Sequence, residues 1–162
     1  MEIGHFYFLT DQYFQRFSDP YLMRNKETVN GKLHGRPCFY AFLDERTQLF
    51  WVIPISSQIE KYKTIYQKKI ERHKQCDTIA FAPIFGHESA FLIQNMCPVS
   101  SKYIFEEYLD QNNIPVRIPG HLEAELIRKA KKVLTLQRQG FSLLFPDSLA
   151  IESILLNELK KQ

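Results

Sequence analysis

Several residue types are scarce in this chain of 162 residues, and each scarcity excludes a class of protein. The only cysteines are Cys38, Cys76 and Cys97, and no two of them form a Cys-x-x-Cys pair. An odd number of widely spaced cysteines argues against a zinc site and against a disulfide framework, and it favours a reducing compartment. We therefore expect the three thiols to pack as small apolar side chains.

Motifs that hold metal ions or nucleotide phosphates are missing as well. None of the five histidines has a second histidine at ligand spacing on an expected helix, and no close acidic cluster could hold two magnesium ions. The sequence has no Gly-x-x-x-x-Gly-Lys-Ser/Thr loop and no Gly-x-Gly-x-x-Gly turn. We expect a protein that binds no metal ion and needs no cofactor.

Long apolar runs are also absent, so no segment is expected to cross a bilayer. Residues 1–5 lack the features of a secretion signal, and we expect a cytoplasmic protein with no membrane partner. Hydrophobic residues make up 44% of the chain, including thirteen Phe and eight Tyr, so a hydrophobic core can form without disulfide bonds. The length predicts a single domain over residues 1–162.

Charge is unevenly distributed although the net charge is only +3. Residues 57–75 carry six basic and two acidic side chains, residues 128–139 carry five basic and none acidic, and residues 76–127 have a net charge of −5. The two basic blocks favour a surface that binds a polyanion such as RNA, although solvated helix faces explain them equally well. The candidate RNA contacts are Lys63, Lys68, Lys69, Arg72, Lys129, Lys131 and Lys132.

Hydrophobic periodicity predicts strands in the first half and helices in the second, which is an α+β plan. Pro98 is expected to end the last strand, because proline cannot extend the ladder. Two antiparallel hairpins are expected. The expected strands are residues 5–9, 37–43, 49–53, 78–85 and 90–96.

Four helices are expected between and after these strands. They begin after Thr10, at Ile59, near Leu122 and at Pro146-Asp147. In the third helix, we expect the basic cluster at residues 128–132 to face outward. Residues 18–36, which include Asn30-Gly31, are expected to form a long loop.

Candidate chemistry lies where an apolar strand meets the lysine-rich helix, at Pro54-Ile55-Ser56-Ser57. A helix N-terminus offers unpaired N–H groups and the positive end of the helix dipole, so it is a common phosphate site. Two hydroxyls there, with Lys61 one turn further on, could bind a phosphodiester. The alternative is that Ser56 or Ser57 only caps the helix, which spacing alone favours, and the two roles are compatible.

Several segments together resemble the ToxN/AbiQ family of toxins from type III toxin–antitoxin systems, with the CptN branch the most similar. The resemblance runs in one order from about residue 3 to about residue 139. Each motif is short, and their common order carries the resemblance. The segments are Phe6-Tyr7 with Tyr13, Arg36-Pro37-Cys38-Phe39-Tyr40, Pro54-Ile55-Ser56-Ser57, the strand Phe91–Val99 with its Asn-Met-Cys-Pro-Val end, and the basic helix with Lys129-Ala130.

This resemblance implies a compact, barrel-like antiparallel β-core with flanking helices, related to the MazF and Kid toxins. It also implies an endoribonuclease that cuts single-stranded cellular RNA without a metal ion and leaves a 2′,3′-cyclic phosphate. Such toxins are held inactive by a noncoding antitoxin RNA of tandem repeats, which they trim themselves. Toxin and RNA close into cyclic assemblies.

The resemblance also implies site residues in this chain. Ser56 and Ser57 match the active-site hydroxyls, Arg36 matches the cation that leads a strand, and Tyr13 matches an N-terminal tyrosine. The chain departs from the family at position 59, where members commonly have lysine and this chain has isoleucine. Lys61 is the next basic residue.

In the implied mechanism, Arg36 and Lys61 stabilise negative charge on the phosphate while the serines hold it. The proton acceptor stays open, because an unactivated serine is a poor general base. His73 is a formal candidate, although a histidine that far along a helix more often packs or faces solvent.

Two other functions fit the same basic faces. One is a non-catalytic RNA-binding module, and the other is an adaptor whose helices bind a protein. Tyrosines interleaved with the basic segments could stack on RNA bases, although most are expected in the core. The grouping of Arg36, Ser56 and Ser57 favours the nuclease.

Overall fold

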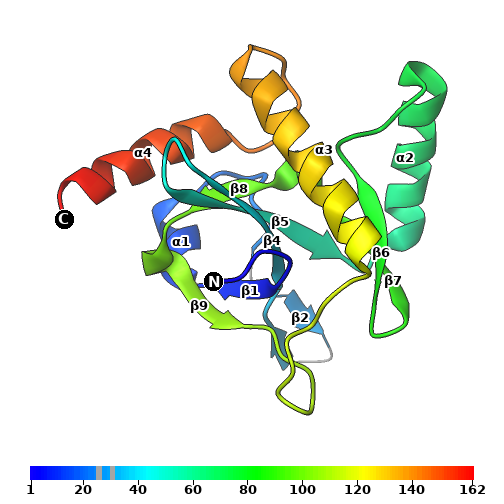
Figure 1. Ribbon diagram of the computed structural model, residues 1–162, viewed down its shortest axis with the longest axis horizontal. Coiled ribbons are helices and arrows are strands. Elements are labelled where there is room, and N and C mark those ends of the chain that lie inside the picture. The colour runs from blue at the N-terminus through cyan, green and yellow to red at the C-terminus, as the bar shows by residue number, and fades with distance from the viewer. Residues whose placement is uncertain (25–26, 30–31) are drawn as a thin grey trace.

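The computed structural model describes residues 1–24, 27–29 and 32–162, and its fold is α+β (Figure 1). Seven antiparallel strands form the main sheet in the order β6-β7-β5-β4-β1-β9, with β8 also paired to β5. Among the described residues, β6 and β9 are edge strands that do not pair with each other. The sheet is therefore open, whereas a barrel-like core was expected; the α+β class is confirmed. The strands are β1 (Phe6–Leu9), β4 (Cys38–Asp44), β5 (Leu49–Ser56), β6 (Ala80–Ile84), β7 (His87–Phe91), β8 (Cys97–Val99) and β9 (Ile104–Glu107).

In the described part of the chain, four α-helices pack around the sheet, near the expected positions (Figure 1). The fourth is capped by Asp147, whose side chain accepts a hydrogen bond from the Ala150 N–H. Two short 3-10 turns, η1 (Ile93–Asn95) and η2 (Ser101–Tyr103), connect the later strands. The helices are α1 (Asp11–Arg16), α2 (Ile59–His73), α3 (Gly120–Arg138) and α4 (Ser148–Lys160).

The two faces of the sheet carry two separate hydrophobic cores. Successive side chains of a strand point to opposite faces, so Phe6 and Tyr7 of β1 belong to different cores. Helix α3 covers the first face with Leu126, Ala130, Val133 and Leu134. Helices α1 and α4 cover the second face with Tyr13, Ile151 and Leu155. All three cysteines are free and buried, as expected, and burial raises the pKa of the Cys97 thiol to about 12.

Three details of the expected strands were wrong. Pro98 lies inside β8, opposite Trp51 of β5, because β8 pairs with β5 alone and an edge strand tolerates the missing N–H. The last predicted strand ends at Phe91, and η1 follows it. The expected loop 18–36 contains a small hairpin of β2 (Glu27–Val29) and β3 (Lys32–His34), whereas the turn signal Asn30-Gly31 lies outside the described residues.

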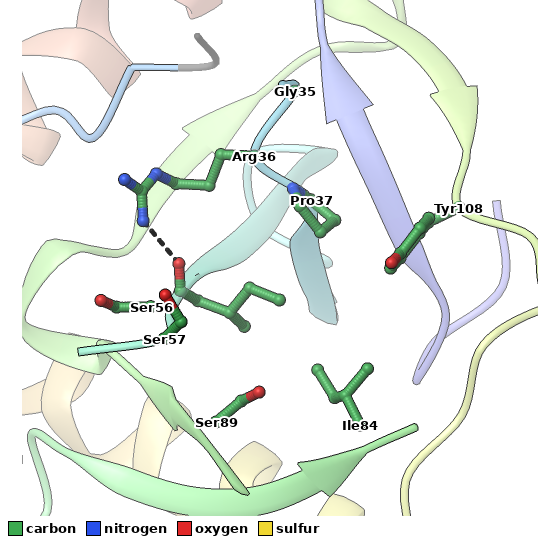
Figure 2. A pocket seen from close by; sticks show the side chains of 9 residues that line it. Gly35, Arg36, Pro37, Ser56, Ser57, Ile84, Ser89 and Tyr108 are labelled. Carbon is green, nitrogen blue, oxygen red and sulfur yellow. Dashed lines mark hydrogen bonds between the residues drawn. The ribbon is translucent and has the colours of Figure 1, made fainter. Parts of the chain in front are cut away.

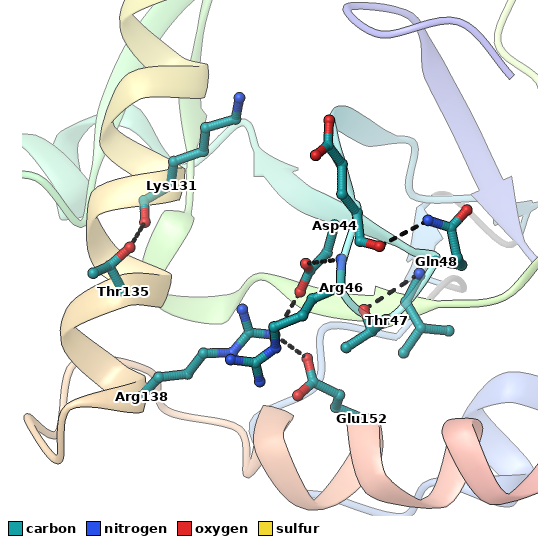
Figure 3. A network of polar contacts seen from close by, with 10 residues as sticks. Asp44, Arg46, Thr47, Gln48, Lys131, Thr135, Arg138 and Glu152 are labelled. Carbon is teal, nitrogen blue, oxygen red and sulfur yellow. Dashed lines mark hydrogen bonds and ion pairs between the residues drawn. The ribbon is translucent and has the colours of Figure 1, made fainter.

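An ion-pair cluster joins helices α3 and α4 to the β4–β5 turn (Figure 3). Arg138 Nη2 lies 2.5 Å from Asp44 Oδ2 and 2.6 Å from Glu152 Oε2, and both carboxylate side chains are only 10% exposed. Burial alone would raise the pKa of Asp44, but hydrogen bonds from Arg138 and from the Arg46 N–H outweigh it, so the pKa is lowered. Asp44 is thus held ionised across the junction of three elements.

Asp44→Asn should lower the free energy of unfolding at pH 7 by about 1.5–3 kcal/mol, the usual value of a hydrogen bond to a charged group. The folded-state pKa of Asp44 lies below its unfolded value of about 3.9, so this stability is present above that pH and is lost as the pH falls through the folded pKa. Urea unfolding of both proteins at pH 7 and near pH 3 measures the difference. Glu45→Gln, at an exposed neighbour, is the control, and a difference that does not shrink in acid contradicts the prediction.

Candidate active site

The register of the β4–β5 hairpin brings the first two candidate residues together. Cys38 lies opposite Pro54 and Phe39 lies opposite Ile53 in this antiparallel pair. Arg36 precedes Cys38 by two residues and Ser56 follows Pro54 by two residues, so the same register places Arg36 beside Ser56. The guanidinium is held there, because its Nη1 donates a 2.7 Å hydrogen bond to the Ile55 carbonyl.

A cavity of about 240 Å³ opens beside this point. Figure 2 shows Arg36, Ser56 and Ser57 on one side of it, with Ile84 and Tyr108 on the opposite side. Three residues expected at the site therefore line one cavity, although they lie some twenty positions apart in the sequence. The complete lining is Gly35, Arg36, Pro37, Ile55, Ser56, Ser57, Ile84, Ser89 and Tyr108.

The two serines have different surroundings. Ser56 is buried, and its Oγ accepts a 3.2 Å hydrogen bond from the Gln58 N–H just before α2. The N-cap of α2 is Gln58, whose side chain makes no capping hydrogen bond, so the expectation that Ser56 or Ser57 caps the helix was wrong. Ser57 is exposed, and its hydroxyl has no hydrogen-bond partner among the described residues. Ser57 is thus the hydroxyl that faces the cavity without a structural task, while Ser56 shapes the turn that presents it.

Arg36 is the cation of the cavity. Burial lowers the pKa of its guanidinium, yet arginine stays protonated at any physiological pH. A half-buried guanidinium is less screened by water than an exposed ammonium group, so it attracts a phosphate more strongly. Its planar fork also matches the geometry of phosphate oxygens.

Lys61 and Lys63 do not line the cavity. Lys61 is exposed on the first turn of α2, with its Nζ 5.3 Å from the centre of the Tyr62 ring. Lys63 Nζ forms an ion pair at 2.8 Å with Glu88 Oε2. The expected role of Lys61 at the scissile phosphate is therefore not supported by the cavity lining, and the charge of Lys63 is balanced by Glu88.

Tyr13 lies in the core instead of the cavity. Its side chain is fully buried on the opposite face of the sheet, and its hydroxyl donates a 2.9 Å hydrogen bond to the Pro98 carbonyl. Burial raises the pKa of this hydroxyl well above its usual value. The expectation of Tyr13 at the site is corrected, because the periodicity of α1 turns it inward.

Part of the expected RNA-binding surface is also internal. Lys129 is 8% exposed, and its Nζ donates a 3.1 Å hydrogen bond to the Cys76 carbonyl, since it shares the inward face of α3. The expectation that residues 128–132 all face outward was therefore wrong. Lys132 pairs with Asp77 at 2.6 Å, and Lys69 donates to Thr78 Oγ1 at 2.6 Å, where burial lowers its pKa. The remaining candidates are exposed: Lys68, Arg72 and Lys131.

His73, the formal proton acceptor, lies at the far end of α2. It lies fourteen positions after Ile59 along the helix, a rise of roughly 21 Å. It is exposed and does not line the cavity. The cavity lining contains no histidine, aspartate, glutamate or lysine.

Ser89 was not expected at the site, and Tyr108 was only one of several tyrosines considered for stacking on RNA bases. Ser89 lies in β7 next to Ala90, which pairs with Ser56. Tyr108 follows β9, and its ring packs edge-on against Phe8 of β1 at 5.4 Å. Ser89 reaches the site because β7 pairs with β5, and Tyr108 reaches it because β9 pairs with β1. Both pairings join segments distant in the sequence, so no local signal marked these residues.

Gly35 allows the chain to pass close to this aromatic cluster. A Cβ at position 35 would lie 2.8 Å from Phe8 Cδ1, which is closer than real side-chain contacts allow. Gly35 immediately precedes Arg36, and the Phe8 ring contacts Tyr108. The missing side chain therefore lets Arg36 and Tyr108 lie on facing walls of one cavity.

Comparison with known proteins shows a likeness of fold and no likeness of sequence. No family model matches the sequence, and no curated protein matches it. Among solved structures, the chain is similar to AbiQ, a lactococcal anti-phage endoribonuclease belonging to a type III toxin–antitoxin system, with a TM-score of 0.68. The sequences are 14% identical, over 99% of this chain and 100% of AbiQ. The chain has the AbiQ fold.

The AbiQ fold agrees with the resemblance of the short motifs to the ToxN/AbiQ family. In the part of the chain that the structure describes, no helix is long and apolar enough to cross a membrane. The same described residues contain no group of three or more His, Cys, Asp or Glu side chains placed to bind a metal ion.

Gly35→Ala should lower the free energy of unfolding by about 1–3 kcal/mol, because the added methyl group overpacks the Phe8 ring. Gly120→Ala is the matched control, since a Cβ there meets nothing within 4 Å, and it should be neutral or stabilising by up to about 1 kcal/mol. Urea unfolding of the three proteins measures both changes. Equal effects of the two substitutions would show that the approach of Gly35 to Phe8 is not tight.

Proposed function

We propose that this chain is an endoribonuclease toxin of a type III toxin–antitoxin system. The proposal holds that it cleaves single-stranded RNA without a metal ion and leaves a 2′,3′-cyclic phosphate. One observation carries it: a half-buried guanidinium and the Ser57 hydroxyl line a single cavity of a protein with the AbiQ fold. AbiQ itself is an endoribonuclease of such a system.

The chemistry requires three events at one phosphodiester. The ribose 2′-OH loses its proton and its oxygen attacks the adjacent phosphorus, the bond from phosphorus to the 5′ oxygen breaks, and that oxygen takes up a proton. Negative charge grows on the non-bridging oxygens during the attack. Arg36 stabilises this charge, and Ser57 donates a hydrogen bond to the same phosphate.

Positioning is the second contribution of the cavity. Arg36 is tied to the Ile55 carbonyl, and Ser56 ties the turn to Gln58, so the groups that hold the phosphate are fixed before RNA arrives. Fixed groups pay no reorganisation cost when charge develops. We propose that Arg36, Ser56 and Ser57 bind and orient the phosphate and stabilise its charge. None of them is proposed as the proton acceptor.

The partners belong to the proposal as well. We propose that an antitoxin RNA of tandem repeats occupies the same cavity and keeps the toxin inactive, and that copies of toxin and RNA close into a cyclic assembly. The exposed cations Lys68, Arg72 and Lys131 are the candidates for holding the RNA outside the cavity. A counterion is released for each phosphate they contact.

The purified chain should cut single-stranded RNA in excess EDTA and leave ends that carry a 2′,3′-cyclic phosphate. The reason is that the lining supplies a cation and hydroxyls that contact a phosphate directly. Mass spectrometry of the fragments measures the ends. Activity lost with the chelator, or ends with a 5′-phosphate, contradict the mechanism, and RNA that is bound but never cut identifies the alternative, a non-catalytic RNA-binding module.

Ser57→Ala should reduce the single-turnover cleavage rate by about 10²–10³-fold, the effect of losing one donor to a transition-state oxyanion. The melting temperature should stay within about 2 °C, because the hydroxyl has no partner among the described residues. Ser142→Ala removes an exposed hydroxyl in the α3–α4 connection and is the control. If Ser57→Ala cuts at the wild-type rate, the assignment of Ser57 is wrong.

A further inference from the structure

The wall of the cavity that faces Arg36 and Ser57 is aromatic. Tyr108 lines it, and the ring of Phe85, at the tip of the β6–β7 hairpin, contacts Tyr108 with 5.9 Å between ring centres. We propose that Phe85 and Tyr108 form a nucleobase subsite, which stacks the base of a nucleotide whose phosphate is bound by Arg36 and Ser57. This inference rests on the proposed function and adds the group that the enzyme recognises beside the scissile phosphate.

The conformation of Phe85 is the first argument. Strands β6 and β7 are joined by two residues, because Ile84 pairs with His87, and Phe85 and Gly86 have φ of 52° and 74°. Positive φ at both positions defines a type I′ turn, which favours Asn-Gly. A phenylalanine at positive φ is strained, so this position carries a residue that the turn itself does not favour.

The exposure of Phe85 is the second argument. Its side chain is 58% exposed at this turn, so the ring contributes little to the core. Strain together with exposure is the combination expected when a side chain serves binding and does not serve folding. The ring is nevertheless placed, because its neighbour Ile84 lines the cavity and its edge meets Tyr108.

Tyr108 provides the surface on which a base could lie. Its ring packs nearly perpendicular to both neighbours, at 72° to Phe8 and 88° to Phe85, which fixes its plane. Figure 2 shows this ring almost edge-on, with one flat face turned toward the cavity. Its hydroxyl has no hydrogen-bond partner in the described part of the chain.

The pairing of the two walls identifies the ligand class. A nucleotide presents a phosphate and a flat aromatic base a short distance apart, and this cavity presents a guanidinium and hydroxyl opposite a fixed aromatic ring. Bases of single strands stack on such rings, and their phosphates bind to arginine. An unpaired nucleotide therefore matches both walls at once, whereas a base within a duplex could not reach the ring.

The test uses single-stranded 2′-O-methyl oligonucleotides, which lack a free 2′-OH and cannot be cleaved. In one series, a single nucleotide at a time lacks its base. Removing the base at one position should weaken binding to the wild-type chain by about 5- to 150-fold, the usual effect of one stacked base. The Phe85→Asn variant should bind the intact oligonucleotide more weakly than the wild type does, by a similar factor. In this variant, removing the base at that position should have little further effect on affinity.

Phe85→Asn also separates binding from folding. Asparagine followed by glycine suits a type I′ turn, so this variant should melt about 2–4 °C higher than the wild type while it binds RNA less tightly. Phe141→Ala is the control, since Phe141 is also 58% exposed but lies in the α3–α4 connection, away from Tyr108 and from the residues that line the cavity. If Phe85→Asn is destabilised and binds normally, or if Phe141→Ala weakens binding as much, the subsite is refuted.

Variants of Tyr108 test the second ring. Tyr108→Phe keeps the ring and should bind within about twofold of the wild type, whereas Tyr108→Leu should lose affinity at the same base position as Phe85→Asn. Equal losses in both variants would assign the effect to the hydroxyl and overturn stacking. Because these oligonucleotides are never cut, a failure of the subsite appears here, and a failure of the nuclease proposal appears only in the cleavage assay.

Discussion

The pairing of β4 with β5 is the constraint on which the rest of the structure depends. These two strands lie at the centre of the sheet, and their residues alternate between the core under α3 and the core under α1 and α4. The same register, continued past Cys38, sets Arg36 beside Ser56. A shift by one residue would exchange the two buried faces and separate the guanidinium from the serines. Core packing on both faces therefore also determines the geometry of the candidate site.

Local signals predicted the parts of the fold that local interactions determine. The hairpin of residues 37–53 and the amphipathic helix from Ile59 were found because periodicity and turn residues lie close together in the sequence. Strands β8 and β9 could not be found in this way. Each has three or four residues, and each is strand only because β5 or β1 supplies its hydrogen bonds. A proline inside β8 was compatible with pairing on one side only, which the sequence does not reveal.

The residues of the candidate site also differ in whether local sequence or distant strand pairing determines their place. Arg36 was named through the family resemblance, and Ser57 through that resemblance and its place at the start of the lysine-rich helix. The pairing of β4 with β5 then brings both residues to one cavity. Tyr108 was considered only as one of several tyrosines, because its place depends on the pairing of β9 with β1 and on the close approach of Gly35 to Phe8. Tyr13 and Lys129 were misplaced for a different reason. A tyrosine and a lysine are common on surfaces that bind RNA, but helical periodicity turned both inward, where a carbonyl satisfies each polar end.

The two walls of the cavity differ in how they are held, and this difference bears on function. The polar wall is formed by the segment before β4, the end of β5 and the start of α2, and hydrogen bonds to the Ile55 carbonyl and to Ser56 Oγ hold it. The aromatic wall combines the tip of the β6–β7 hairpin with the segment after β9, two elements at opposite ends of the strand order that meet through the Phe85–Tyr108 contact. A rigid polar wall suits the fixed geometry that phosphate chemistry requires. An aromatic wall accepts different bases, because stacking depends on a flat surface and not on a fixed set of donors and acceptors. Phosphate geometry and base recognition can therefore vary separately in this fold, since Phe85 changes without altering the hairpin that holds Arg36.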